Sequence, residues 1–535
     1  MIAVNQIGYE SRKKKHATIT GGRKFFLYRE DGSLVKEGTT GELTPDENSG
    51  EDAAVIDFSD VTETGNYYLQ EEDGTKSCIF RIADNTPALY HLLHTDALRM
   101  LYFQRCGMDL EEKYAGKFGH KACHCQDAYC LGDASHKRKL IGGWHDAGDY
   151  GRYSTAGAVA LGHLLYGFLI NTSVYEDLET NIPESGNGIP SVLNECRYEL
   201  DWLLQMQEAD GGVHHKATSA KFVDFIMPEE DKEEIVITPV SSLATADFAA
   251  ITALAARVYR DYDPDFSEKC KQAALLSGEW LEKNPAMLFE NPREVTTGSY
   301  EDLCDADERF WAAVELYQLT EDPKQMDRIR QILELRINTN ALGWADVGGF
   351  GTLSLLISAP DSFHPLLLER LKGCWMDEAD RLTALSESNA YEITLRPYNF
   401  IWGSNMLVLC NAMILCMAHR LSGNDTYLEA AYHQLDYILG RNAVNTSYVT
   451  GYGERAFRHP HNRPTIADGI DDPIPGFVSG GPNAFSNDTQ ANPETMKGRA
   501  PMKWHADAEL SYCSNEITIY WNSPLVFVLG YFLGL

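Results

Sequence analysis

The chain has 535 residues, of which 44% are hydrophobic and 23% charged, an ordinary composition for a globular protein with a large apolar core. Asp and Glu outnumber Lys and Arg by 78 to 46, which gives a formal net charge of −32. Because such an excess of negative charge repels phosphate backbones and anionic lipid, we expect neither nucleic-acid nor membrane partners.

No apolar run of the sequence approaches the ~20 residues that a membrane span needs. The first residues, Met1 to Gln6, lack the basic and then apolar pattern of a secretory signal, so we expect a cytoplasmic protein, or a secreted one if a leader has been removed. Twelve cysteines in so long a chain predict reduced thiols rather than a disulfide framework.

Residues 1–83 are predicted to form a small all-β sandwich. Short β-rich runs are separated by Asp-Gly and Thr-Gly turn signals, and they cover residues 24–28, 54–58, 66–69 and 78–82. The domain boundary is expected at residues 84–87, where Thr86 can cap a helix that starts at Pro87.

Residues 84–535 are predicted to form a second, mainly α-helical domain. Apolar residues repeat with helical spacing at 88–105, 156–169, 190–207, 241–259, 267–282, 305–319, 323–335, 365–385, 401–420, 426–439 and 517–533. Strand signals are nearly absent among them, and the pattern fits either a toroid of helical hairpins or an irregular bundle. Three connections, 120–149, 211–238 and 441–514, exceed the usual loop length, so we expect them to carry function.

Two acidic motifs lie in these long segments. Asp146 and Asp149 stand among glycines and aromatic residues, where a carboxylate pair can hold and deprotonate a water molecule; an Asp-rich turn that caps the next helix is the alternative. Glu516 has apolar neighbours, Ile517 and Trp521, and apolar surroundings raise the pKa of a carboxyl group, which suits a general acid. The alternative is a glutamate in the first turn of a helix, stabilised by the helix dipole. Together the two motifs suit hydrolysis of a glycosidic bond.

Cationic and aromatic residues supply candidate sugar contacts. His461 and Arg463, in a Pro-bounded loop, suit hydrogen bonding to sugar hydroxyls or anion binding, and a solvated basic turn is the alternative. The candidates for sugar-stacking platforms are Tyr153, Trp311, Trp344 and Trp402. Trp311 lies in a helical apolar run and is as readily a core residue.

Four candidate metal ligands lie before the aspartate-bearing turn or at its start: Cys106, Cys123, His124 and His145. Two thiolates and two imidazoles make a closed tetrahedral zinc set, although the spacing is not that of a standard finger. His120, Cys125, Cys130 and His136 crowd the same stretch, so a reduced Cys/His-rich loop stays open as the alternative.

An ordered series of motifs resembles glycoside hydrolase family 9, in the branch with an N-terminal immunoglobulin-like domain. The matching stretches run through nearly the whole chain, at residues 4–9, 142–149, 184–190, 210–213, 215–216, 245–250, 402–405, 461–463, 480–483 and 515–524. The resemblance implies an (α/α)₆ barrel that hydrolyses β-1,4-linked glucan with inversion, and an immunoglobulin-like domain that packs on this barrel in cis. A β-1,4-linked gluco-oligosaccharide is then the expected substrate.

The resemblance also implies roles for individual residues. Asp149 matches the general base, Asp146 helps to hold the water, and Glu516 matches the general acid. His461 and Arg463 match positions that bind sugar next to the scissile bond. Some members bind zinc at positions that match the four Cys and His residues above; this zinc is expected to be structural, and calcium is a further candidate cofactor.

Some residues depart from the family pattern, and these bear on the sugar subsites. Asn462 stands where relatives often have a second histidine, while His505 and Ala508 replace residues that are commonly Tyr and Asp. Asp507 keeps its place nine residues before Glu516. Alternative functions are an exo-acting β-glucosidase or exo-β-glucosaminidase on the same barrel, or a carbohydrate-binding protein without catalysis.

Overall fold

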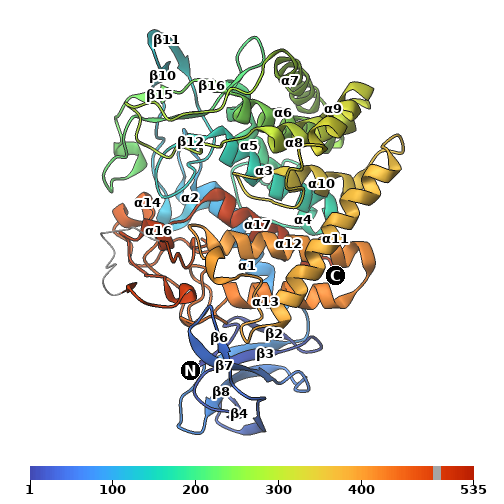
Figure 1. The fold of residues 1–535 in the computed structure, drawn as a ribbon. Coiled ribbons are helices and arrows are strands. Elements are labelled where there is room, and N and C mark those ends of the chain that lie inside the picture. Colours follow the sequence, from blue (N-terminus) through green and yellow to red (C-terminus); the bar gives the residue numbers. More distant parts are fainter. Residues whose placement is uncertain (486–495) are drawn as a thin grey trace. The chain divides into compact units, whose positions relative to one another are not determined.

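The computed structural model describes residues 1–485 and 496–535 (Figure 1). Two compact units make up the chain. The first comprises residues 1–100, 378–533 and 535, and the second comprises residues 101–377 and 534.

An N-terminal β-sandwich, drawn in blue in Figure 1, opens the first unit. Its strands are β1 (Ile2–Ala3), β2 (Gly8–Glu10), β3 (His16–Ile19), β4 (Lys24–Arg29), β5 (Leu34–Thr39), β6 (Thr44–Asp46), β7 (Glu51–Asp57), β8 (Gly65–Glu71) and β9 (Phe80–Ala83). One sheet has the order β1-β3-β7-β6 and the other the order β2-β9-β8-β4-β5. The last strand of the sandwich ends at Ala83, and the first helix begins at Pro87.

Alternating side chains of both sheets meet in one core. Along β4, Phe25 and Leu27 point inward, and Leu27 lies opposite Leu69 of β8. Ala17 and Ile19 of β3 join the same cluster from the other sheet. Period-two burial of this kind fixes the register, because a slip by one residue would turn every apolar side chain outward.

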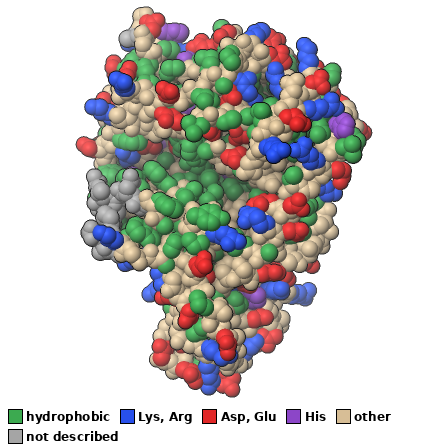
Figure 2. Space-filling view, in the orientation of Figure 1, with side chains coloured by type: hydrophobic (Ala, Val, Ile, Leu, Met, Phe, Trp, Pro, Cys, Tyr) green, Lys and Arg blue, Asp and Glu red, His purple; other side chains and the backbone are tan. Residues whose placement is uncertain are grey.

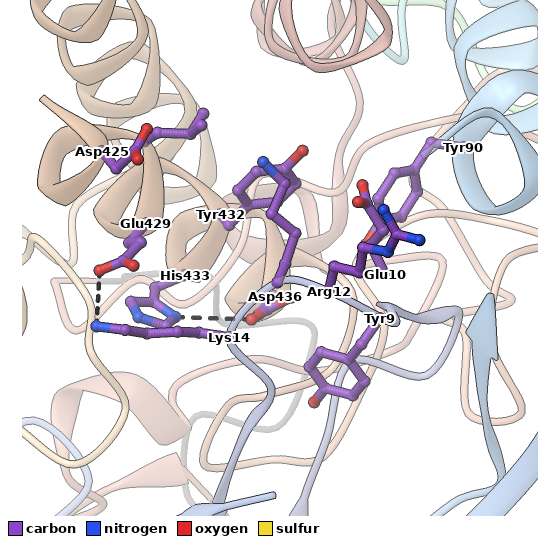
Figure 3. Close-up of a pocket in the computed structure, with 12 residues that line it drawn as sticks. Tyr9, Glu10, Arg12, Lys14, Tyr90, Asp425, Glu429, Tyr432, His433 and Asp436 are labelled. Carbon is purple, nitrogen blue, oxygen red and sulfur yellow. Dashed lines mark ion pairs between the residues drawn. The ribbon is translucent and has the colours of Figure 1, made fainter. Parts of the chain in front are cut away.

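The sandwich contacts the helical part of the first unit through polar side chains. Asn5 Nδ2 donates to Asp436 Oδ1 at 2.8 Å, and the Thr18 hydroxyl donates to the carbonyl of Ala390 at 2.8 Å. His16 Nδ1 lies 2.9 Å from Glu392 Oε2. A cavity of about 400 Å³ also lies here, lined by residues of both parts that include the ion pair of Lys14 with Glu429 (Figure 3).

The helices have these bounds in chain order: α1 (Pro87–Phe103), α2 (Glu112–Ala115), α3 (Ser154–Ile170), α4 (Thr172–Glu176), α5 (Ser191–Met206), α6 (Ser242–Val258), α7 (Pro264–Lys283), α8 (Ala306–Thr320), α9 (Pro323–Leu333), α10 (Gly348–Ser358), α11 (Pro365–Glu387), α12 (Ser404–Ser422), α13 (Asp425–Ile438), α14 (Arg463–Ala467), α16 (Tyr512–Asn515) and α17 (Ile519–Leu533). Short 3₁₀ turns are η1 (Gly116–Phe118), η2 (Pro228–Glu230), η3 (Tyr259–Asp261), η4 (Pro397–Asn399) and η5 (Pro501–Lys503).

Several helices begin where side chains cap them. Asp263 accepts a hydrogen bond from the backbone N–H of Phe266 at 3.0 Å, and Pro264 occupies the first position of α7. Asp322 and Pro323 repeat the arrangement at α9, and Asn424 caps α13. These residues satisfy N–H groups that have no partner within the helix, so they set the start points.

Burial separates two kinds of helix. In the second unit, α3 and α6 are buried on nearly all sides, whereas α7 has one buried face and one exposed face. In the first unit, α12 and α17 are largely buried and α13 contacts α12. By length and composition α12 could cross a membrane, but 72% of its apolar window is buried inside the molecule, as in a core helix.

The predicted helices are found with small shifts of their ends, and two predictions are wrong. Helix α10 is absent from the prediction because its glycine-rich start and short length hide the period. Strands are present after residue 84, where they were expected to be nearly absent: β10 (Asp127–Cys130), β11 (Asp133–Lys139), β12 (Arg152–Tyr153), β13 (Val213–His214), β14 (Lys216–Ser219), β15 (Ile235–Ile237) and β16 (Val240–Ser241). They are too short and too mixed in polarity to show alternation.

These short strands organise the long connections of the second unit. One sheet has the order β11-β10-β15-β14-β12, and β13 pairs with β16. On the face drawn in Figure 2, acidic and basic side chains are interspersed over the surface. The aspartate-bearing turn runs directly into β12, so the sheet fixes the end of that turn.

Candidate active site and metal cluster

Asp146 lies in a buried turn of the second unit. Its side chain is 2% exposed and accepts a hydrogen bond at Oδ2 from the hydroxyl of Tyr300. Among the described residues, none donates a hydrogen bond to its Oδ1. Burial raises the pKa of Asp146 well above its usual range, and the charge of Asp149 adds to this, while the hydrogen bond from Tyr300 opposes it.

Asp149 is held differently in the same turn. Its Oδ2 accepts hydrogen bonds from the backbone N–H of Gly151 at 3.0 Å and from the hydroxyl of Tyr153 at 3.3 Å. A Cβ at position 151 would lie 2.8 Å from this oxygen and 2.6 Å from the Tyr153 hydroxyl, so only glycine fits beside the carboxylate. Two fixed donors orient Asp149 with little freedom to turn.

A buried lysine supplies positive charge to this region. Lys216 is fully buried, and its Nζ donates to the carbonyl of Gly298 at 2.6 Å and to Oδ1 of Asn291 at 2.8 Å. Burial lowers the pKa of Lys216 to about 8, although the charge of Asp149 acts to raise it. In the sequence Lys216 is visible only as part of a motif, and Tyr300 gives no signal because it lies in a segment without periodicity.

Hydrogen bonds with the residue after α1 and with α5 hold the aspartate-bearing turn in place. Gln104 Nε2 donates to the carbonyls of His145 and Ala147, both at 2.9 Å. The backbone N–H of Trp144 donates to Glu199 at 2.6 Å, and its indole N–H donates to Glu195 at 2.8 Å. Such bonds reduce the freedom of the turn that carries Asp146 and Asp149.

Glu516 lies in the first unit and is the residue that directly follows α16. Its carbonyl accepts a hydrogen bond from the N–H of Gly480 at 2.8 Å, and the N–H of His461 donates to the carbonyl of Asn515 at 2.9 Å. His461 and Glu516 thus form a parallel bridge. The structure brings together the acidic motif and the cationic loop, which are 55 residues apart in sequence.

The cationic loop has a defined ring orientation and a helix start. His461 Nδ1 lies 2.6 Å from the carbonyl of Glu509, which can only accept, so Nδ1 carries the proton. Arg463 is 7% exposed and is the first residue of α14. Asn462 caps this helix by accepting from the N–H of Thr465 at 3.2 Å.

Asp507 connects the cationic loop to the acidic motif. Its carboxylate accepts hydrogen bonds from the N–H groups of Arg458 at 2.9 Å and His459 at 2.8 Å, and from Asn515 Nδ2 at 3.2 Å. His505 Nε2 lies 3.1 Å from Asn515 Oδ1. Asp507 therefore fixes the backbone shortly before His461 and the side chain of Asn515, the residue before Glu516.

The structure distinguishes the four aromatic candidates. Trp311 is fully buried and its indole N–H donates to the Tyr166 hydroxyl, so it presents no face to a sugar, and the platform prediction is wrong for it. Tyr153 is 2% exposed and its hydroxyl donates a hydrogen bond to Asp149, so the prediction of a sugar-stacking platform is wrong for Tyr153 as well. Trp344 is partly exposed and packs edge-on against Tyr300. Trp402 is 50% exposed, with its ring centroid 5.5 Å from that of Tyr512.

The four predicted metal ligands meet in one buried cluster of the second unit. Cys106 Sγ lies 3.9 Å from Cys123 Sγ and 3.6 Å from His124 Nδ1. His145 Nε2 lies 3.7 Å from Cys123 Sγ and 3.4 Å from His124 Nδ1. With zinc bond lengths, the edges of a tetrahedron are about 3.8 Å for S–S, 3.6 Å for S–N and 3.4 Å for N–N. The observed separations match this geometry.

The surroundings of the cluster also suit a metal. His124 Nε2 lies 3.1 Å from Asp231 Oδ2, the carboxylate–histidine arrangement that orients a metal-bound imidazole. The N–H of His145 donates to the carbonyl of Gln104 at 2.7 Å, and the N–H of Cys106 donates to that of Gly143 at 2.8 Å. The cluster is thereby tied to the turn that carries Asp146.

A second acidic group of the same unit includes the buried residues Asp247, Asp307 and Glu308. Asp247 is fully buried, and neither of its oxygens has a hydrogen-bond partner among the described residues. Burial and the charges of Asp307 and Asp302 raise its pKa, and burial and the charges of Asp247 and Asp307 raise that of Glu308. Burial, with Asp307 and Asp302, raises the pKa of Asp346 to about 6. Such a group is unfavourable when ionised, unless a cation joins it.

Comparisons with known proteins cover nearly the whole chain. The model of glycosyl hydrolase family 9 matches residues 90–529, and that of the cellulase N-terminal ig-like domain matches residues 1–76. A cellodextrinase from Butyrivibrio fibrisolvens is 42% identical, with 99% of each chain covered.

Solved structures share the fold. A single mutant of a thermostable endoglucanase from Alicyclobacillus acidocaldarius is 34% identical, with a TM-score of 0.92 and 99% of each chain covered. A Zn-binding triple mutant of the family 9 endoglucanase J30 is 30% identical, with a TM-score of 0.91, over 98% of this chain and 99% of that one. These likenesses confirm the predicted fold class, an (α/α)₆ barrel preceded by an immunoglobulin-like β-sandwich. The chain therefore belongs to glycosyl hydrolase family 9, and it is a glycoside hydrolase of the cellulase type.

Proposed function

We propose that the chain hydrolyses β-1,4-glucosidic bonds of cellodextrins and soluble β-glucans, with inversion at the anomeric carbon. The observation that carries the mechanism is the unequal environment of Asp146 and Asp149 in one turn. Asp146 is buried, its pKa is raised and one oxygen has no hydrogen-bond partner among the described residues, whereas Asp149 is oriented by two donors. Pairs of carboxyl groups in unlike environments take unlike catalytic roles.

In this mechanism Asp149 is the general base. A water molecule held by Asp146 gives its proton to Asp149 as its oxygen attacks the anomeric carbon, and the glycosidic bond breaks in the same step. The proton that the leaving sugar needs comes from Glu516. Inversion follows because water, and not a carboxylate of the protein, forms the new bond.

The role of Glu516 can be tested separately from that of Asp149. Glu516→Ala should lose most turnover on cellotetraose, whose leaving sugar needs a proton. The variant should recover much of its turnover on an aryl cellobioside with a good leaving group, while Asp149→Ala should not. Equal losses of Glu516→Ala on both substrates would contradict the general-acid role.

His461, Arg463 and Trp402 are the proposed sugar contacts. His461 is fixed by its hydrogen bond to Glu509, Arg463 begins a helix, and Trp402 exposes half of its surface beside Tyr512. An exposed aromatic face next to fixed polar groups suits a pyranose, which has apolar faces and hydroxyl edges.

Short cello-oligosaccharides are the proposed preferred substrates. The cellodextrinase from Butyrivibrio fibrisolvens, similar over 99% of both chains, supports this choice. Products from cellopentaose should be compared with those from soluble polymeric glucan at equal glucose content. Faster cleavage of the pentamer supports the proposal, whereas a rapid loss of viscosity of the polymer would indicate an endoglucanase. No relative described above supports a β-glucosidase, a glucosaminidase or a non-catalytic binding protein.

We also propose that one zinc ion binds Cys106, Cys123, His124 and His145. The match of the ligand separations to a zinc tetrahedron supports this, as does the Asp231 contact of His124. Four protein ligands close the coordination sphere, so the ion would be structural and would contribute to the free energy of folding. Its place next to Asp146 would hold the aspartate-bearing turn in shape.

Calcium is the proposed ion for an acidic group of the second unit, in which Asp247, Asp307 and Glu308 are buried and Asp302 and Asp346 are partly exposed. Carboxylate oxygens are the ligands that calcium prefers. The support is electrostatic: burial and neighbouring carboxylates raise the pKa values of Asp247, Glu308 and Asp346, and Asp247 has no hydrogen-bond partner among the described residues. A divalent cation would relieve this repulsion.

A further inference from the structure

A second group of metal-ligand side chains lies in the second unit and shares no residue with the zinc cluster. Cys130, Glu208 and His214 each offer one ligand atom, and these atoms lie within 4.8 Å of one another. Cys130 ends β10, His214 ends β13, and Glu208 lies in the turn between α5 and β13. Three separate segments therefore converge here.

The ring of His214 is oriented as in metal-binding histidines. Its side chain is 9% exposed, and its Nδ1 lies 2.6 Å from the carbonyl of Thr238. A carbonyl only accepts, so Nδ1 carries a proton, and Nε2 faces Glu208 Oε1 at 2.7 Å. A histidine that donates one ring N–H to a backbone carbonyl presents its other nitrogen for ligation.

The short contact between His214 and Glu208 requires a positive charge between them. A lone pair of Nε2 and a carboxylate oxygen repel each other at 2.7 Å unless a proton or a metal ion lies between. A proton joins only these two atoms. The thiol of Cys130 supplies a third ligand atom in the same place, and a metal ion uses all three.

We propose that Cys130, Glu208 and His214 form a second, exchangeable site for a divalent transition metal such as zinc or cobalt(II). Thiolate, imidazole and carboxylate together suit these ions. Three protein ligands leave one position to water, so the site holds its ion less tightly than the closed four-ligand cluster. The proposal is independent of the glycosidase mechanism and of the structural zinc.

Binding changes protons and contacts in a defined way. The ion displaces the proton of Cys130 and the proton on His214 Nε2, and both leave to solvent. Ligand atoms of a tetrahedral ion lie about 3.4 Å apart, so Glu208, which is 29% exposed, turns slightly from its present contact. Arg138, which donates to Glu208 and to the carbonyl of Gln205, pairs with the carboxylate in the metal-free form.

The backbone around the site is well fixed. Strand β10 pairs with β11 on one side and β15 on the other. The N–H of Glu208 donates to the carbonyl of Gly212 at 2.7 Å, and the N–H of Gly211 donates back to the carbonyl of Glu208 at 2.9 Å. An ion here would cross-link the end of β10 to the turn between α5 and β13.

Cobalt(II) titration of the full-length, zinc-replete protein after exhaustive dialysis tests the proposal. The wild type should take up one cobalt ion per chain, with a thiolate-to-cobalt charge-transfer band. Cys130→Ser should lose the band, and His214→Gln should bind at least about tenfold more weakly. Cys374→Ser, which removes an exposed thiol elsewhere in the same unit, should behave as the wild type.

A second measurement avoids substitutions. Excess zinc should slow the labelling of Cys130 by a thiol reagent, as followed by peptide mass spectrometry, while labelling of Cys374 stays unchanged. An unchanged rate at Cys130, no uptake of cobalt, or a band that persists in Cys130→Ser would overturn the proposal and leave only an ion-pair network of Arg138, Glu208 and His214.

Discussion

The hydroxyl of Tyr300 donates a hydrogen bond to Oδ2 of Asp146, although the two residues are 154 positions apart in sequence. The bond orients a buried carboxyl group whose other oxygen has no hydrogen-bond partner among the described residues. Asp146 is thus fixed at one oxygen, while its other, buried oxygen is left for the water molecule that the proposed mechanism requires.

The first prediction separates the two aspartates. Asp149→Asn removes the base and should lower turnover about 100- to 10,000-fold. Asp146→Asn keeps the shape of a neutral carboxyl group and should cost only about tenfold, the value of one hydrogen bond. Steady-state kcat on cellotetraose measures both, and equal losses would show that Asp146 must be ionised.

Stability offers a check on the same pair. Because the pKa of Asp146 is raised in the fold, protonation stabilises the folded state, and this contribution is lost as the pH rises through the folded value. Asp146→Asn should therefore melt at a higher temperature than the wild type at pH 8. The difference should shrink as the pH falls toward 4.

A second prediction contrasts two tryptophans. Trp402→Ala removes an exposed ring and should raise KM for cellopentaose about two- to tenfold, with a small change in the melting temperature. Trp311→Ala empties a core position and should cost about 3–5 kcal/mol of stability. Kinetics and calorimetry distinguish the two, and an unchanged KM in Trp402→Ala would remove it from the binding surface.

A third prediction concerns zinc. Protein purified without added metal and then dialysed should retain about one zinc ion per chain, the number for one closed four-ligand site. Its removal by a strong chelator should lower the melting temperature by more than about 5 °C. Cys123→Ser should lose the ion, whereas Cys374→Ser should keep it. Zinc-free wild-type protein would leave a reduced Cys/His-rich loop in its place.

A fourth prediction concerns calcium and pH. Without the ion, the raised pKa values of Asp247, Glu308 and Asp346 mean that stability falls as the pH rises through the folded values, near 6 for Asp346. Calcium at a hundred times its Kd should add about 2.7 kcal/mol at pH 7.5 and less at pH 5, where protons compete. Asp247→Asn should weaken the response. An equal effect of magnesium would indicate screening and not a site.

The sequence predicted the features that depend on local, continuous patterns of apolar and capping residues. Helix α6 spans Ser242–Val258 against the predicted 241–259, because its apolar spacing and its Ser241 cap are both local. The start of the first helix at Pro87 was equally visible. Helix α10 and strands β10 to β16 were missed because short elements owe their structure to the neighbours with which they pack and pair.

The candidate site shows the same division. Asp146, Asp149 and the four ligands of the proposed zinc lie in recognisable stretches, so their residue types could be interpreted. Tyr300, Asp231 and the group around Cys130 reach their partners only through tertiary structure. Trp311 was ambiguous because periodicity does not separate a core tryptophan from a binding one.

The anomeric configuration of the first product tests the central proposal most directly. Proton NMR during the first minutes of cellotetraose hydrolysis, before mutarotation equilibrates the anomers, reports the configuration at the new reducing end. A single displacement by the water that Asp149 activates predicts that the α-anomer appears first. Initial appearance of the β-anomer would mean a covalent intermediate and would contradict the roles proposed for Asp149 and Glu516.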